Sequence, residues 1–155
     1  SARRDLAIAE EQAFNAWEMM GAVLHGWGLA MQGPPQPGID QMQRGLEAWC
    51  ATGAHNLRPL FQALQADAWL ASGQPQRALQ AAEAGLLGAS TGERCWAPEL
   101  HRLRALALAA LGERAPALSA LHTAVATAET MGALGWRDRA LASLAGLKHN
   151  ESNPA

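Results

Sequence analysis

The sequence predicts an all-α fold made of antiparallel helix pairs, and three observations support this prediction. The 155 residues are rich in Ala and Leu and poor in β-branched residues, a composition that favours helix over sheet. A sparse residue pattern recurs at intervals of 40 and 39 residues, in segments that begin at Gly33, Gly73 and Gly112. On both sides of these glycines, apolar residues are spaced as they are on one face of a helix. We expect about three repeats of 39–40 residues followed by a terminal helix.

Aligning the three glycines brings residues of similar size to the same offsets. Large apolar residues precede the glycine by nine and four positions, and small residues follow it by five and twelve positions. These residues are Leu24, Leu64, Leu103, Leu29, Trp69 and Leu108 before the glycine, and Gly38, Ala78, Ala117, Gly45, Gly85 and Ala124 after it. The glycine suits the left-handed residue that ends many helices. Because a lone helix pair cannot bury both of its apolar faces, we expect neighbouring pairs to stack.

The same pattern predicts the individual helices. They are expected near residues 3–12, 14–31, 38–51, 57–71, 76–88, 97–110, 115–131 and 136–147. Leu6 matches Leu46 when the pattern is projected back by one repeat, so residues 3–12 are expected to belong to an incomplete repeat. Pro59 and Pro98 fall in the first turns of their helices, where a missing N–H costs little, and Asn56 suits an N-cap. The last helix repeats the pattern loosely and is expected to pack over the end of the array.

These elements are expected to form a single domain over residues 1–148, taken from a longer protein. Residues 149–155, with the sequence HNESNPA, are polar and are expected to be a disordered tail.

Several repeat positions resemble the tetratricopeptide repeat. They are the small residue seven positions before the glycine (Gly26, Ala66, Ala105), the large residue four before it, the glycine itself, and the small and large residues five and nine after it. The sequence also departs from that repeat, whose standard length is about 34 residues. The usual Trp and Leu at eleven and eight positions before the glycine are replaced by Ala22, Gln62, His101 and by His25, Gln65, Arg104.

The longer unit is similar to the helical repeats of large bacterial signalling ATPases. These include LuxR-type and maltose-activator-type transcriptional regulators, and predicted ATPases linked to cyclase domains. The segments LHGWGLAMQG, TGERCWAPELHRLRALALAALGE and GALGWRDRALASLAGL carry the resemblance, which extends over about residues 10–148. It implies a right-handed α-α superhelix that acts as a cytoplasmic, non-catalytic scaffold for protein interaction or sensing.

Composition and motifs argue against other classes of function. The formal charge of −2 disfavours a nucleic-acid partner, and no stretch is long and apolar enough for a membrane span. A phosphate-binding loop is absent, since Lys148 is the only lysine, so we expect no cofactor, no metal and no enzymatic activity. Glu99 and Asp67 read as isolated carboxylates. Cys50 and Cys95 are separate, which favours two reduced thiols over a disulfide or metal site.

A candidate binding site follows from polar residues at repeat positions that are normally apolar. In tetratricopeptide arrays these positions line the concave face, so they predict a groove for an extended peptide or a small effector. The candidate residues are His25, Trp27, Gln62, Gln65, His101 and Arg104. The alternative is that these side chains are simply solvated. Trp27 either lines the groove or fills a gap between repeats, whereas Trp17, Trp69 and Trp96 fall at core positions.

Three hypotheses for function remain open at this stage. The first is a scaffold that binds a protein, a peptide or another domain of its parent. The alternative is a small-molecule effector domain that controls a parent ATPase or cyclase. An enzyme would require His101 within hydrogen-bond distance of Glu99 or Asp67. In each case the apolar N-terminal helix lacks a neighbour, so we expect a weak homodimer or end-to-end stacking.

Overall fold

The computed structural model describes residues 2–152. Within this range the chain forms seven α-helices, one short 3-10 helix and no strand, which confirms the predicted all-α class. Contacts divide the chain into two compact units, unit 1 (Ser1–His55) and unit 2 (Asn56–Ala155), whereas the sequence predicts one domain over residues 1–148. Across residues 2–152, no helix combines the length and the apolar character that crossing a membrane requires.

Unit 1 is a hairpin of two helices, α1 (Ala2–Gln32) and α2 (Pro35–Ala51). The predicted break near residue 13 is wrong, because α1 continues without interruption through both predicted helices. Residues 7–20 contain no Gly or Pro and are rich in Ala and Glu, which favour a continuous helix. The incomplete repeat expected at residues 3–12 is therefore the first part of α1.

The two helices of unit 1 approach most closely where glycine faces glycine. A Cβ atom added to Gly26 would lie 2.7 Å from the carbonyl oxygen of Gly38. A Cβ atom added to Gly38 would lie 2.5 Å from the backbone nitrogen of Ala30. Met42 is buried beside this contact, and Val23 is buried where Gly45 of α2 meets α1. The small residues predicted to bring the helices together have this role in unit 1.

The link between α1 and α2 differs from the prediction in its backbone conformation. Gly33 lies between the helices, as expected, but it is not among the glycines with positive φ. Pro34 follows it, and a residue before proline is restricted to extended conformations. The left-handed glycine of unit 1 is Gly53 instead, with φ of 79°, after the end of α2.

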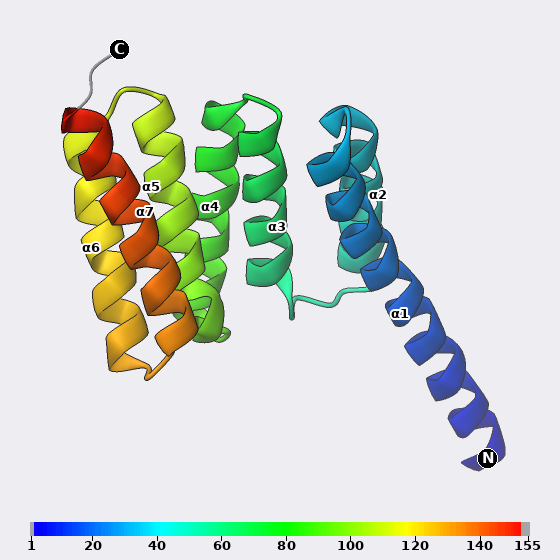
Figure 1. Cartoon of the computed structure of the whole chain (residues 1–155). Helices are drawn as coiled ribbons and strands as arrows, with labels where there is room; N and C mark the ends of the chain where they lie inside the picture. The colour runs from blue at the N-terminus through cyan, green and yellow to red at the C-terminus, as the bar shows by residue number, and fades with distance from the viewer. Residues whose placement is uncertain (1, 153–155) are drawn as a thin grey trace. The chain divides into compact units, whose positions relative to one another are not determined.

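Unit 2 contains two helical hairpins and a final helix, which lie side by side (Figure 1). The first hairpin is α3 (Arg58–Ala71) with α4 (Pro75–Thr91). The short 3-10 helix η1 (Arg94–Trp96) leads to the second hairpin, α5 (Ala97–Ala110) with α6 (Arg114–Thr130). Helix α5 packs against both α3 and α4, so the two hairpins are stacked.

The final helix, α7 (Leu134–Ser152), packs against α6 and α5, as predicted for a helix that covers the end of the array. It continues beyond residue 147, so the predicted disordered tail (149–155) begins inside a helix, and residues 153–155 lie outside the described residues.

Three turns in unit 2 share one geometry. Gly73, Gly112 and Gly132 have φ of 70°, 84° and 67°. After each glycine, the next N–H donates to the carbonyl oxygen five residues earlier: Gln74 to Trp69, Glu113 to Leu108, and Ala133 to Ala128. This is the Schellman motif, which requires a left-handed residue that glycine adopts without strain. The predicted left-handed turns at Gly73 and Gly112 are confirmed, and the structure adds a third at Gly132.

The repeat positions predicted to be small or apolar form the interior of unit 2. The residues at five, nine and twelve positions after Gly73 and Gly112, and seven before them, are all buried. They are Ala66, Ala78, Ala82, Gly85, Ala105, Ala117, Leu121 and Ala124. Pro59 and Pro98 lie in the first turns of α3 and α5, as expected.

The start of α3 does not use the predicted cap. The N-cap position is Leu57, not Asn56, and Leu57 has a positive φ of 63°. Its N–H donates to both carboxylate oxygens of Glu93, at 2.8 and 2.9 Å. Glu93 precedes η1, so its carboxylate joins the start of the first hairpin to the start of the second.

Several tryptophan and leucine residues predicted to lie in the core do not. Trp17 is 70% exposed, and Leu24 and Leu29 are also exposed, because α2 packs against a different face of α1. Trp69 is buried, as predicted. Trp96 is only half-buried, and its ring centroid lies 6.0 Å from that of Trp136.

Candidate functional site

Unit 1 contributes two of the six candidate residues, His25 and Trp27 of α1. His25 is exposed, and its Nδ1 lies 2.9 Å from the side-chain amide nitrogen of Gln41 on α2. The same amide nitrogen donates to the carbonyl oxygen of Ala22 at 3.1 Å. His25 therefore accepts a hydrogen bond that ties α1 to α2. Trp27 is half-buried in α1.

Unit 2 contributes the other four candidate residues, and all four are half-buried. Gln62 and Gln65 lie on α3, and His101 and Arg104 lie on α5, two helices that contact each other. A Cβ atom added to Gly85 of α4 would lie within 3.0 Å of Gln62 Cβ and 2.6 Å of the Leu100 side chain. The stretch of α4 around Gly85 is therefore packed against both α3 and α5.

An ion pair extends this region onto α4. Arg104 Nε lies 3.3 Å from a carboxylate oxygen of Glu83, and both side chains are partly exposed. We call Gln62, Gln65, Glu83, His101 and Arg104 the polar face of unit 2. Glu83 had not been a candidate, because nothing in the sequence pattern indicates which α4 residue lies opposite Arg104.

The surroundings of His101 favour the neutral form of its imidazole. Burial lowers the pKa of its imidazole below 6.5, and the positive charge of Arg104 lowers it further. Its Nδ1 is buried and, within the described residues, has no hydrogen-bond partner. A neutral imidazole adds no positive charge to that of Arg104, so the pair is a weak candidate for binding an anion.

Glu99, one of the two carboxylates that an enzyme would require beside His101, is engaged elsewhere. Glu99 and Arg102 are buried and form two hydrogen bonds, from Arg102 Nε at 2.8 Å and from Nη2 at 2.6 Å. Arg139 of α7 adds an ion pair to Glu99 at 3.3 Å. The prediction that Glu99 is isolated is wrong. Arg102 is itself buried in this cluster, 7% exposed.

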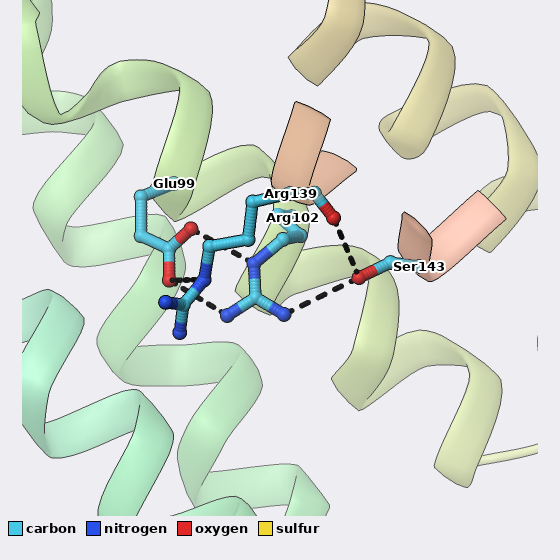
Figure 2. A network of polar contacts seen from close by, with 4 residues as sticks. All are labelled: Glu99, Arg102, Arg139 and Ser143. Atoms are coloured by element: carbon cyan, nitrogen blue, oxygen red, sulfur yellow. Dashed lines mark hydrogen bonds and ion pairs between the residues drawn. The ribbon is translucent and has the colours of Figure 1, made fainter. Parts of the chain in front are cut away.

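The cluster joins α5 to α7, as Figure 2 shows. Arg102 Nη1 donates to the hydroxyl of Ser143 at 3.3 Å, and that hydroxyl donates to the carbonyl oxygen of Arg139 at 3.3 Å. The carboxylate of Glu99 and the guanidinium of Arg102 are thus bonded to one another and to α7, so the arrangement joins two helices. The spacing of Glu99 and Arg102, three residues apart on one helix, is the only part of the cluster that the sequence indicates.

Two surface depressions of unit 2 lie away from the candidate residues. One has a volume of about 450 Å³ and is formed by η1, the start of α5 and the end of α6. The other, of about 460 Å³, is formed at the start of α7 and includes Trp136 and Arg139. Across residues 2–152, no group of three His, Cys, Asp or Glu side chains could hold a metal ion. Cys50 and Cys95 are both free thiols.

Comparison with known proteins finds similarity to a much longer protein. The chain is 32% identical over 121 residues to an uncharacterized protein of Rhizobium meliloti (strain 1021). The match covers 77% of this chain but only 12% of that protein, so the chain corresponds to a small part of its relative. No protein-family model matches the chain, and no solved structure matches it.

Proposed function

We propose that the chain is a tetratricopeptide-like repeat module that serves as a non-catalytic interaction scaffold within a larger bacterial regulatory protein. The observation that carries this proposal is the repetition within unit 2. Hairpins α3–α4 and α5–α6 end their first helices in the same Schellman turn, bury small residues at the same offsets, and stack on one another. A stack of this kind offers an extended surface rather than a single deep pocket, as solenoid binding proteins do.

The remaining parts of the proposal rest on sequence resemblance. They are a right-handed superhelix, a cytoplasmic location, and a parent protein of the signalling ATPase type. The match to a small part of a much longer relative supports a role as one module among several.

We place the binding surface on the polar face of unit 2. Gln62 and Gln65 each carry an amide that both donates and accepts hydrogen bonds, as the backbone of an extended peptide does. The ion pair of Arg104 with Glu83 is partly exposed, so a charged partner can compete for either member at little cost. The partner that these groups fit is an extended polypeptide, from another protein or from another domain of the parent.

A displayed library of random peptides provides the test. The wild-type chain is compared with a Gln65→Ala/Arg104→Ala variant and with a control, Gln80→Ala/Glu129→Ala, whose two residues are exposed on α4 and α6. Peptides selected by the wild type should bind the first variant at least about tenfold more weakly and the control equally well. Equal loss in both variants, or no selected peptide at all, would contradict the proposal.

The alternative function is a small-molecule effector domain, and one observation favours it. The buried Nδ1 of His101 has no partner among the described residues, and a bound ligand could supply one. A ligand that binds only the folded chain raises its melting temperature, by an amount set by ligand concentration and affinity. Screening sugars and metabolites by thermal shift, with His101→Phe as the control, tests this function. A hit that persists in the variant would argue against His101 as its site.

A further inference from the structure

One of the two surface depressions lies in the second hairpin of unit 2, where α5 begins and α6 ends. Its volume of about 450 Å³ falls within the range of sites that hold small molecules, roughly 300–1,000 Å³. The lining residues are Arg94, Ala97, Ala126, Thr127, Thr130 and Met131. Helices α5 and α6 have neighbours on both sides, α4 and α7. The opening is therefore not the face of a helix that lacks a neighbour.

The repeat pattern alone does not produce this depression. At the repeat positions of Ala97 and Ala126, the first hairpin has Arg58 and Leu87. The second hairpin thus has two methyl groups where the first has a long side chain and a branched one, and the smaller groups leave space. The depression is a property of the second hairpin, and a residue taken from the first hairpin should fill it.

Arg94 supplies a positive charge on the η1 side of the depression. Its side chain is exposed, and within residues 2–152 it forms no ion pair or hydrogen bond. The carboxylate of the preceding residue, Glu93, accepts the N–H of Leu57 instead. A guanidinium group matches the geometry of a carboxylate, which can accept two of its N–H groups. Arg94 is therefore available to pair with the carboxylate of a ligand.

The α6 side of the depression offers hydrogen-bond acceptors and a partial negative charge. The hydroxyls of Thr127 and Thr130 donate to the carbonyl oxygens of Thr123 and Ala126, at 2.7 and 2.9 Å. While their protons are engaged in this way, the two hydroxyl oxygens can only accept hydrogen bonds from a ligand. The C-terminal end of a helix favours a cation, and the last turn of α6 contains no basic residue. This side therefore suits an ammonium group.

The remaining lining is apolar and consists of Ala97, Ala126 and Met131. We propose that the depression binds a free α-amino acid with an apolar side chain. The carboxylate of the ligand pairs with Arg94, and its ammonium group lies against the hydroxyl oxygens at the end of α6. The ligand side chain contacts the two alanines and Met131, whose flexible thioether adapts to different shapes. The site is separate from the polar face of unit 2, so it does not depend on peptide binding there.

Titration calorimetry of the full chain with the apolar L-amino acids tests the site. At least one of them should bind with a dissociation constant below about 1 mM. Arg94→Gln should raise that constant at least about tenfold by removing the charge, and Ala126→Leu should do the same by filling the space. The matched controls Arg44→Gln and Ala84→Leu, at exposed positions of α2 and α4, should leave it unchanged. All four changed residues are exposed, so each variant should unfold at nearly the wild-type temperature.

Analogues of the amino acid that binds most tightly test the two charged ends. Its amide, which lacks the carboxylate, should bind the wild type at least about tenfold more weakly, and Arg94→Gln should not weaken the amide further. The acid without the amino group should also bind more weakly. Thr127→Val removes one acceptor oxygen, so it should weaken the amino acid and leave the acid without the amino group unaffected.

Three results would overturn the proposal. They are the absence of binding by every amino acid up to about 10 mM, binding that Arg94→Gln and Ala126→Leu leave unchanged, and equal binding of the acid without the amino group. An N-acetylated peptide that ends in the same residue distinguishes a chain terminus from a free amino acid. If this peptide binds more tightly than the amino acid, the depression is a site for a peptide terminus and the proposal is wrong.

Discussion

Replacing Gly38 by Ala is expected to destabilise unit 1, although the same replacement at Gly21 is expected to stabilise it. A Cβ atom at position 38 would overlap the carbonyl oxygen of Gly26 and the backbone nitrogen of Ala30. These are backbone atoms of α1, so the overlap can be relieved only by moving the two helices apart. At Gly21, in contrast, an added Cβ atom meets nothing within 4 Å.

The size of each effect follows from two opposing terms. Exchanging Gly for Ala inside a helix contributes about 1 kcal/mol of stability, and this term applies at both positions. Overpacking a close contact costs about 1–3 kcal/mol, and the rigid backbone on the opposite side places Gly38→Ala at the upper end of that range. The net expectation is a loss of about 2 kcal/mol for Gly38→Ala and a gain of up to about 1 kcal/mol for Gly21→Ala.

Hydrogen exchange measured on the peptide that covers α2 is the suitable assay, because it reports on unit 1 even if the two units unfold separately. A loss of about 2 kcal/mol corresponds to roughly thirtyfold faster exchange of the protected amides. Gly21→Ala should slow the same exchange. If Gly38→Ala exchanges as slowly as the wild type, the close approach of α1 and α2 at this glycine is refuted.

Three further predictions concern unit 2. Glu99→Ala leaves buried Arg102 without its carboxylate and should cost about 3–5 kcal/mol in urea unfolding, whereas Glu99→Leu combined with Arg102→Met should cost much less. Glu93→Ala removes the acceptor of the Leu57 N–H and should cost about 1–3 kcal/mol, while Glu93→Gln, which retains an acceptor oxygen, should cost less, as thermal unfolding can show. Because the folded pKa of His101 lies below 6.5, the unfolded chain binds more protons as the pH falls through this range. Stability should therefore decrease on acidification below 6.5, and an equal decrease in His101→Gln would contradict this assignment.

The repeat pattern predicts the interior of unit 2 well, because it depends on local features. The small residues five positions after Gly73 and Gly112 face a neighbouring helix, and these residues, Ala78 and Ala117, are both fully buried. The left-handed turns at Gly73 and Gly112 follow from the same local chemistry. At Gly33 the expectation was wrong because a neighbouring proline constrains the backbone more strongly than the repeat does.

The errors concern positions whose surroundings are set by distant helices. Leu24 and Leu103 occupy the same repeat position, yet Leu24 is 43% exposed and Leu103 is 1% exposed. Burial at this position depends on whether another helix covers that face, and a repeat offset does not contain this information. The break predicted near residue 13 has a different cause, since the helix propensity of this Ala- and Glu-rich segment outweighs the repeat pattern and α1 continues through it.

In the candidate site, too, local spacing predicts some features, whereas others depend on how distant helices pack. The half-buried polar residues Gln65 and Arg104 lie on neighbouring helices, which their shared repeat position suggests. The contacts of Glu99 with Arg139 and of Arg104 with Glu83 join residues 40 and 21 positions apart, so they depend on how helices pack. Only the part of the cluster within one helix, Glu99 with Arg102, could be read from spacing.

The interior of unit 2 is built largely from the smallest side chain that a helix readily accepts. The buried alanines are Ala63, Ala66, Ala68, Ala78, Ala81, Ala82, Ala89, Ala105, Ala107, Ala117, Ala120, Ala124, Ala128 and Ala140. At such positions nearly every missense change adds volume, and the close helix spacing leaves no room for it. Larger side chains at these interior positions should therefore destabilise the module, whereas most substitutions on its surface should be accepted. In a saturation mutagenesis profile, the positions that accept no larger residue should recur with the period of the repeat.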